Sequence, residues 1–184
     1  VHVVGCPIGL GSCVQWDTRL DSRIAGAVMG IQAFKAVEIG LGRGCGERTG
    51  SQVHDAIRFD PQRTGEPHLG FVRETNHAGG LEGGMTNGMP VVVTGTMKPI
   101  ATLLQGLPSV NLVSKESERS DYERSDVCAL PAASVVMEAV VGFEVARAFL
   151  ERFGGDSMPQ VRANHERTME LARSLPLPGR EVGD

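Results

Sequence analysis

Apolar residues recur at helical spacing along the first part of the chain, after a turn rich in glycine. Leu20, Ile24, Ala27, Ile31 and Phe34 stand three or four positions apart. Because a helix completes a turn every ~3.6 residues, this spacing gathers their side chains on one face. The pattern predicts an amphipathic helix that ends near residue 34 or 35.

A longer apolar stretch occupies residues 132–153, and the proline before it, Pro131, suits the first turn of a helix. Valine and phenylalanine stand on most sides of the helix that this stretch predicts. We therefore expect this helix to be buried on several sides. A final amphipathic helix is predicted over residues 158–174, where Pro176 and Pro178 follow its end.

Short β-like segments and turns fill the remaining sequence. We expect a strand at residues 1–4, strand fragments joined by turns over residues 40–70, and a strand over residues 90–95. Residues 103–112 are predicted to be irregular. Residues 114–126 are dense in charge and serine and are predicted to form a mobile surface loop.

Composition narrows the class of protein. The chain has 184 residues, of which 41% are apolar and 22% charged, as in one soluble globular domain. A net charge of −4 argues against non-specific nucleic-acid binding, and no apolar run reaches the ~18 residues of a membrane span. The first residues show neither a secretory signal nor an initiator methionine. We therefore expect a cytoplasmic chain that is processed, trimmed or a fragment.

Cysteine spacing argues against a metal site. Cys6, Cys13, Cys45 and Cys128 form no Cys-x-x-Cys pair and have no histidine at ligand spacing. We therefore expect no metal, and four thiols that are reduced and partly buried.

Two of the five histidines are candidates for a functional site. His54 stands directly before an aspartate, and His77 lies inside a glycine-rich loop. Of the other three, His2 and His68 are predicted to be surface or loop residues, and His165 is predicted to lie on the polar side of the last helix.

Three segments combine residue types that packing alone seldom requires. Residues 73–88 set amide and hydroxyl side chains among paired glycines, which lets backbone N–H groups approach an anion or a flat ring. Residues 98–102 place an ammonium and a hydroxyl on a proline-stiffened loop, which suits phosphate. Residues 123–126 place an arginine and carboxylates before the long helix. The residues alone predict either a site for an anionic, phosphorylated ligand or a set of turns with a surface ion pair.

Six motifs, in order along the chain, resemble the C-terminal half of the chorismate synthase family. They are residues 9–12 with 14–17, 31–40, 50–55, 76–88, 98–102, and 124–128 with 131–133. Six ordered motifs are far more specific than any single glycine cluster. The resemblance extends over residues 1–156 and leaves residues 157–184 as a C-terminal helix and tail.

The resemblance implies a fold and an activity. The fold is α+β, a β–α–β sandwich with long helices packed between antiparallel sheets, of which this chain covers about one half. Family members convert 5-enolpyruvylshikimate 3-phosphate to chorismate by anti-1,4-elimination of phosphate, a lyase step of the shikimate pathway to aromatic amino acids. They require reduced FMN and assemble as homotetramers. Nucleic acids and membranes are not expected partners.

Site residues are implied by the same resemblance, position by position. Those that match flavin-contacting positions are Gln32, Ala33, Gly83, Lys98, Pro99, Ile100, Ala101, Thr102 and Arg124. Asp126 matches a catalytic carboxylate that helps to relay the proton. The two active-site histidines of the family lie in its N-terminal half, and neither His54 nor His77 corresponds to them.

Some residues depart from the family pattern, and other functions stay open. Gly30, Ala36 and Met89 replace the usual residues, and the Ala36 methyl group would clash if that position needed a positive φ. One alternative is a non-catalytic fragment that binds FMN or phosphate. Another is an interaction fragment that folds only against a partner chain.

Overall fold

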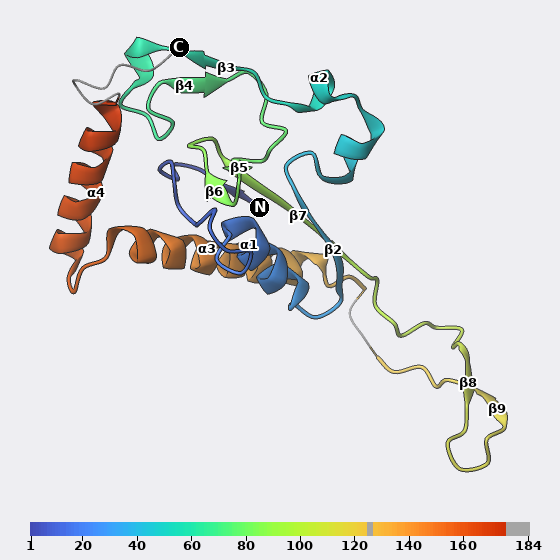
Figure 1. The fold of residues 1–184 in the computed structure, drawn as a ribbon. Coiled ribbons are helices and arrows are strands. Elements are labelled where there is room, and N and C mark those ends of the chain that lie inside the picture. The colour runs from blue at the N-terminus through green and yellow to red at the C-terminus, as the bar shows by residue number, and fades with distance from the viewer. Residues whose placement is uncertain (125–126, 176–184) are drawn as a thin grey trace.

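The computed structural model describes residues 1–124 and 127–175. Its centre is a three-stranded antiparallel sheet in the order β1 (His2–Val3), β7 (Val91–Met97) and β2 (Phe34–Ile39). Helices α1 (Leu20–Met29) and α3 (Leu130–Phe153) lie against one side of this sheet (Figure 1). The main core therefore sits between the sheet and the two helices.

The first helix is shorter than its apolar spacing predicts. It begins at Leu20 and ends at Met29, with Gly30 as its C-cap. The backbone then turns, and Ala33 takes a φ of 69°, outside the right-handed helical region. Phe34 opens β2 instead of ending the helix, and it is 5% exposed. The predicted end of the helix is wrong because a core strand buries a phenylalanine as well as a helix does.

The long helix α3 confirms the prediction over residues 132–153 and has Pro131 in its first turn. One stripe, which includes Met137 and Val141, is buried, and α3 packs against α1. The opposite side is open to solvent, where Val135 is 64% and Phe143 69% exposed. Burial on several sides is therefore not observed in the described part of the chain.

The last helix, α4 (Met158–Arg173), agrees with the predicted one within a residue. Gly154 and Gly155, with φ of 57° and 119°, turn the chain between α3 and α4. The ring centroid of His165 lies 5.5 Å from that of Phe149 and 4.9 Å from that of Phe153. His165 is therefore half-buried between the two helices and does not lie free at the surface.

Short elements occupy the region between β2 and β7. Residues 40–70 contain one strand fragment, as predicted, but also three short helical elements that were not predicted. The elements there are η1 (Gly42–Glu47), α2 (Gly50–Val53), β3 (Ile57–Phe59) and η2 (Pro61–Arg63). β3 pairs with β4 (Phe71–Arg73), and β5 (Leu81–Glu82) pairs with β6 (Met85–Thr86), both antiparallel.

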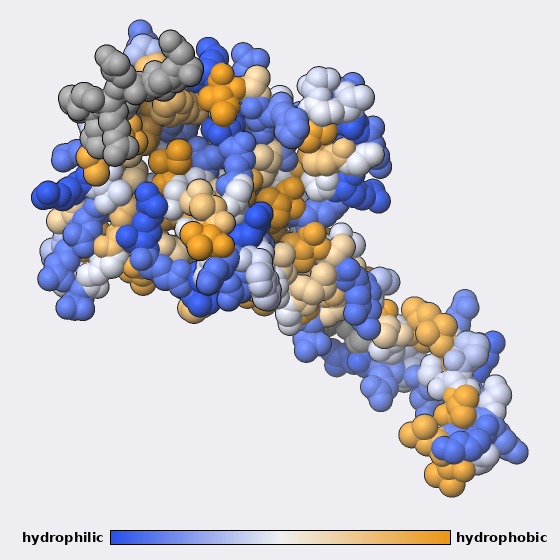
Figure 2. All heavy atoms as spheres, in the orientation of Figure 1, coloured by the Kyte–Doolittle hydropathy of each residue, from blue (hydrophilic) through white to orange (hydrophobic). Residues whose placement is uncertain are grey.

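Residues 103–124 extend from the body as a projecting segment, which we call the arm (Figure 1). Within the arm, β8 (Pro108–Val110) pairs antiparallel with β9 (Ser117–Arg119), and every residue of both strands is exposed. The predicted irregular stretch and surface loop therefore contain a hairpin. Three-residue strands with neither face buried are too short for an alternating pattern to predict them. Figure 2 shows apolar side chains gathered near the end of the arm.

His68, predicted to be a surface or loop residue, lies in a turn but is only 3% exposed. The Gly70 N–H donates to its Nδ1 at 3.2 Å, and its Nε2 lies 2.9 Å from a carboxylate oxygen of Glu66. Both ring nitrogens thus have polar partners inside the fold, which makes burial of this ring possible.

The four thiols are free in the described chain. Cys6 is buried, and burial raises the pKa of its thiol. Cys13, Cys45 and Cys128 are exposed, so partial burial holds for one thiol of the four. Within residues 1–124 and 127–175, no helix is long and apolar enough to cross a membrane. In the same ranges, no group of three or more histidine, cysteine or acidic side chains is placed to hold a metal ion.

Candidate functional site

Two of the family-matched segments meet at one end of the central sheet. The Lys98 N–H donates to the Ala33 carbonyl oxygen at 2.8 Å, next to the paired residues Phe34 and Met97 of β2 and β7. The left-handed backbone at Ala33 makes this turn from α1 into the strand. The hydrogen bond therefore joins the segment of Gln32 to the segment that starts at Lys98.

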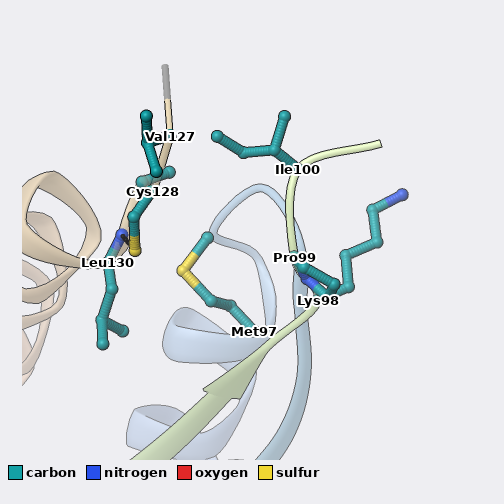
Figure 3. A pocket seen from close by; sticks show the side chains of 8 residues that line it. Met97, Lys98, Pro99, Ile100, Val127, Cys128 and Leu130 are labelled. Atoms are coloured by element: carbon teal, nitrogen blue, oxygen red, sulfur yellow. Dashed lines mark hydrogen bonds between the residues drawn. The ribbon is translucent and has the colours of Figure 1, made fainter. Parts of the chain in front are cut away.

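A pocket of about 240 Å³ opens between this end of the sheet and the start of α3 (Figure 3). Its lining comes from two segments, which are Met97, Lys98, Pro99 and Ile100 on one side and Val127, Cys128, Ala129 and Leu130 on the other. Figure 3 shows the side chain of Met97 between the two walls. Apolar walls of this kind suit a flat ring.

One cationic residue, Lys98, belongs to the pocket lining, and Arg124 precedes the opposite wall by three residues in the sequence. The Lys98 side chain points away from the cavity (Figure 3), and the Arg124 side chain is exposed. Ala129 and Leu130 line the pocket at the N-terminal end of α3, where the helix carries partial positive charge. The arrangement suits a ligand with an apolar ring and an anionic group.

The remaining flavin-contacting candidates divide between this end of the sheet and the other end of α1. Gln32 and Ala101 are exposed, and Thr102 is half-buried, on the same two segments as Ala33 and Lys98. None of these three residues lines the pocket.

Gly83 lies elsewhere, in the turn between β5 and β6, with a φ of 59°. The neighbouring Gly84 carbonyl accepts the Leu20 N–H at 2.9 Å, which places this turn at the first residue of α1. Ala33 follows the opposite end of that ten-residue helix, roughly 15 Å along its axis. The structure does not bring Gly83 to the pocket. Asp126 lies outside the described residues.

The glycine-rich loop is held by a buried carboxylate, Asp55, whose side chain is 1% exposed. Asp55 accepts the N–H groups of His77 and Ala78, both at 2.9 Å, and the Thr75 hydroxyl at 2.5 Å. Burial by itself raises the pKa of the Asp55 carboxyl, but the Ala78 N–H, the Thr75 hydroxyl and the His77 N–H together outweigh it and lower the pKa. Many polar groups of this loop thus serve the fold and not a ligand.

The two candidate histidines also fall into structural positions. His77 Nδ1 lies 3.1 Å from the Val53 carbonyl oxygen, to which a neutral ring donates. The ring therefore helps to tie the glycine-rich loop to α2. His54 caps the end of α2 and is exposed. Neither histidine lines the pocket.

The pocket walls contain residues that sequence reasoning did not assign, chiefly Met97, Cys128 and Leu130. Met97 and Leu130 each directly precede a matched stretch, and Cys128 ends one. The only sequence signal for these residues was their position next to the motifs. That signal did not indicate a binding role, because apolar side chains at these positions look like ordinary core residues.

The fold and the pocket define an α+β protein with a candidate site for an anionic ring compound. A family model described as chorismate synthase matches residues 1–150. The chain therefore belongs to the chorismate synthase family, and the α+β fold expected from the six motifs is confirmed.

Individual relatives agree with the family. The chorismate synthase of Geobacter metallireducens is 55% identical over 176 residues, which are 95% of this chain and 45% of the relative. That of Bacillus cytotoxicus is 56% identical over 175 residues, 95% of this chain and 43% of the relative. A crystal structure of chorismate synthase matches with a TM-score of 0.75 at 43% identity, over 94% of this chain and 43% of that one. The chain spans about half the length of the curated relatives it matches.

Proposed function

We propose that the chain forms part of a chorismate synthase, which converts 5-enolpyruvylshikimate 3-phosphate to chorismate by anti-1,4-elimination of phosphate. One observation carries the proposal. The hydrogen bond from the Lys98 N–H to the Ala33 carbonyl joins two family-matched segments beside a largely apolar pocket whose lining includes Lys98. As an enzyme of aromatic amino acid biosynthesis, it is proposed to work in the cytoplasm.

Reduced FMN is the proposed cofactor, and the residues of the pocket fit part of it. The apolar walls suit its ring, and the cationic groups of Lys98 and Arg124 suit its phosphate. The cavity of about 240 Å³ is smaller than the ~300–1,000 Å³ of whole ligand sites. The pocket of this chain is therefore sized for the ring alone. Bound reduced FMN would supply electron density as the carbon–oxygen bond to phosphate breaks.

The proposed roles follow from position. Pro99 and Ile100 form one wall, Lys98 provides charge at its edge, and Ala101 and Thr102 continue the same loop. Gln32 offers an amide beside them. We assign Gly83 to a part of the ligand beyond the pocket and Asp126 to holding the proton that the substrate loses. These two assignments rest on the family match.

We also propose that the enzyme is a homotetramer and that the family-like portion ends near residue 156. The turn at Gly154 and Gly155 supports this boundary, because α4 begins only a few residues later. The small-molecule substrate and further copies of the chain are the proposed partners.

Anaerobic titration of the chain with FMN reduced by dithionite tests cofactor binding. Binding should change the flavin absorbance, and Lys98→Gln should weaken it about tenfold, because one charge-assisted contact contributes about 1.4 kcal/mol. Arg167→Gln is the matched control, since this exposed arginine lies on α4, away from the pocket and from the arm. An absence of binding, or equal weakening by both substitutions, would contradict the proposed site.

Phosphate release from the substrate separates the enzyme from the alternatives. Binding together with release indicates that this chain carries enough of the site for turnover. Binding without release favours the non-catalytic flavin-binding alternative, which the small volume of the pocket supports. A chain that neither binds FMN nor unfolds cooperatively is the interaction fragment.

A further inference from the structure

Arg73, the last residue of β4, is a buried cation to which the proposed function gives no role. Its side chain is 7% exposed, and its Nη2 lies 2.5 Å from the carboxylate oxygen Oε2 of Glu82 in β5. The Arg73 Nε is also buried and has no hydrogen-bond partner among the described residues. A buried ion pair with an unmatched donor contributes little net stability, so stabilisation alone does not account for Arg73. Further chain packed around this half would only bury it more.

The carboxylate of Glu82 is fixed by two separate segments. The oxygen that pairs with Arg73 also accepts the Asn87 side-chain N–H at 2.9 Å. Asn87 is 5% exposed, and its own side-chain oxygen accepts the Met89 N–H at 2.9 Å. Glu82 therefore has a defined position between β4 and the segment that follows β6.

Glu82 directly precedes the turn of Gly83 and Gly84, which joins β5 to β6 (Figure 1). Each of these strands has two residues, and so short a hairpin does not hold its own shape in water. Both glycines have a positive φ, 59° and 86°, as in the tight turns of hairpins. The Leu20 N–H anchors the turn on the Gly84 side, and the Glu82 side chain anchors it on the Gly83 side.

We propose that Arg73 is a positioning residue that, through Glu82, sets the backbone of Gly83 for contact with the ligand. The proposal rests on the proposed function, in which Gly83 contacts the flavin cofactor beyond the pocket. A Cβ at Gly83 would have no atom within 4 Å, so the described chain leaves this side of the turn open. Arg73 does not itself touch the ligand, because its guanidinium is buried.

The contribution of the pair is position and not charge. Arg73 and Glu82 carry opposite charges 2.5 Å apart, so together they present no net charge to an anionic ligand. The Arg73 Nη1 also reaches the Phe71 carbonyl oxygen at 3.5 Å, so the planar fork joins its own strand to Glu82. A lysine ammonium lacks this fork.

Anaerobic titration with FMN reduced by dithionite tests the proposal at a temperature where each variant is folded. Glu82→Gln and Arg73→Lys should each weaken binding about tenfold, because the turn loses a contact on the order of one hydrogen bond to the ligand. The double variant should bind no more weakly than either single variant, since the two side chains act as one unit.

Two controls separate positioning from charge and from stability. Glu74→Gln removes a carboxylate next to Arg73 in the sequence, but Glu74 is exposed and lies 3.9 Å from Arg58, so binding should not change. Val161→Ala removes core volume in α4, where Val161 is 4% exposed. It should lower the urea midpoint and leave the affinity of the folded chain unchanged.

Amide hydrogen exchange followed by NMR tests the same claim without flavin. The Asn87 N–H donates to the Gly80 carbonyl oxygen at 3.0 Å, and the Leu20 N–H donates to that of Gly84 at 2.9 Å. In Glu82→Gln, both should exchange about threefold faster relative to the Val93 N–H, which lies in the central sheet.

Several results would overturn the proposal. Unchanged FMN affinity in Glu82→Gln would do so, as would equal weakening by Glu74→Gln or Val161→Ala. A double variant about a hundredfold weaker would show two independent contacts. Exchange at the turn that does not rise relative to Val93 would also overturn it. If the unchanged chain binds no flavin, the proposed function fails, and hydrogen exchange alone decides whether the pair positions the turn.

Discussion

The backbone conformations of Ala33 and Ala36 decide where strain lies near the candidate site. A positive φ at Ala36 would have strained its methyl group, but Ala36 lies in β2 opposite Thr96, in ordinary strand backbone beside a β-bulge. The positive φ falls at Ala33, where a non-glycine residue in this region costs about 1–2 kcal/mol. The strain is placed where the backbone turns toward Lys98, which is consistent with a constrained site.

Gly79→Ala should destabilise the chain by about 2–4 kcal/mol. The φ of Gly79 is 63°, and an added Cβ would lie 2.3 Å from the Gly40 nitrogen, so both strain and backbone overlap oppose alanine. Urea unfolding measures the change. Gly142→Ala is the control, because Gly142 lies in α3 with open space around it and alanine there should stabilise by up to ~1 kcal/mol. Equal midpoints for the two variants would refute this account of the loop.

Asp55→Asn should lower stability at pH 7 by about 1–3 kcal/mol, because a buried charge-assisted acceptor is lost. The folded chain holds the pKa of this carboxyl below its ordinary value. The stability that Asp55 contributes is therefore present above the unfolded pKa of ~3.9 and is lost as pH falls through the lower folded value.

Thermal unfolding between pH 7 and about pH 3 measures this dependence, which should be weaker in Asp55→Asn. The exposed Asp121 provides the control, since Asp121→Asn should keep both the stability and its pH dependence. An Asp55→Asn chain that loses stability in acid as steeply as the unchanged chain would contradict the role of this carboxyl.

At the scale of elements, α3 stabilises the fold through one stripe only. Met137 is 5% exposed on this stripe, whereas Val135 faces solvent. Met137→Ala should destabilise by about 2–5 kcal/mol, as for other large-to-small core substitutions. Val135→Ala should change stability by less than about 0.5 kcal/mol. Denaturant midpoints compare the two variants, and a large effect of Val135→Ala would show that the outer side of α3 is covered.

The arm connects the element scale to the site. It follows directly after Thr102 and ends at Arg124, both of them flavin-contacting candidates. A contact that orders the arm therefore also restrains the two segments at its base. This link makes the oligomeric state relevant to the pocket.

At the scale of the whole molecule, cofactor binding and self-association should be coupled. If the proposed self-association restrains the arm, and with it the segments of Thr102 and Arg124 at its base, reduced FMN binds the associated chain more tightly and by linkage promotes association. The apparent FMN affinity should then rise with chain concentration, and this dependence should be lost where substitutions abolish self-association. Anaerobic titrations at several chain concentrations measure it. If the FMN affinity of the unchanged chain did not depend on chain concentration, flavin binding and self-association would not be coupled.

Local signals in the sequence determined the helices of the C-terminal third and the family. The helical periodicity of residues 132–153 and 158–174 depends only on residues that are close in the sequence, and so does each of the six motifs. Both can therefore be recognised without knowledge of the tertiary structure. The same signals named Gln32, Ala33 and Lys98 as site residues by resemblance, and those roles remain predictions.

Only the tertiary structure decided which of these residues come together. The end of α1, the burial of His68 and Asp55, the hairpin in the arm and the pocket beside Met97 all depend on contacts between distant parts of the chain. The bond between Lys98 and Ala33 spans more than sixty residues. Periodicity and propensity describe neighbours along the chain, whereas these features are set by packing and hydrogen bonds between segments that meet only in the folded state.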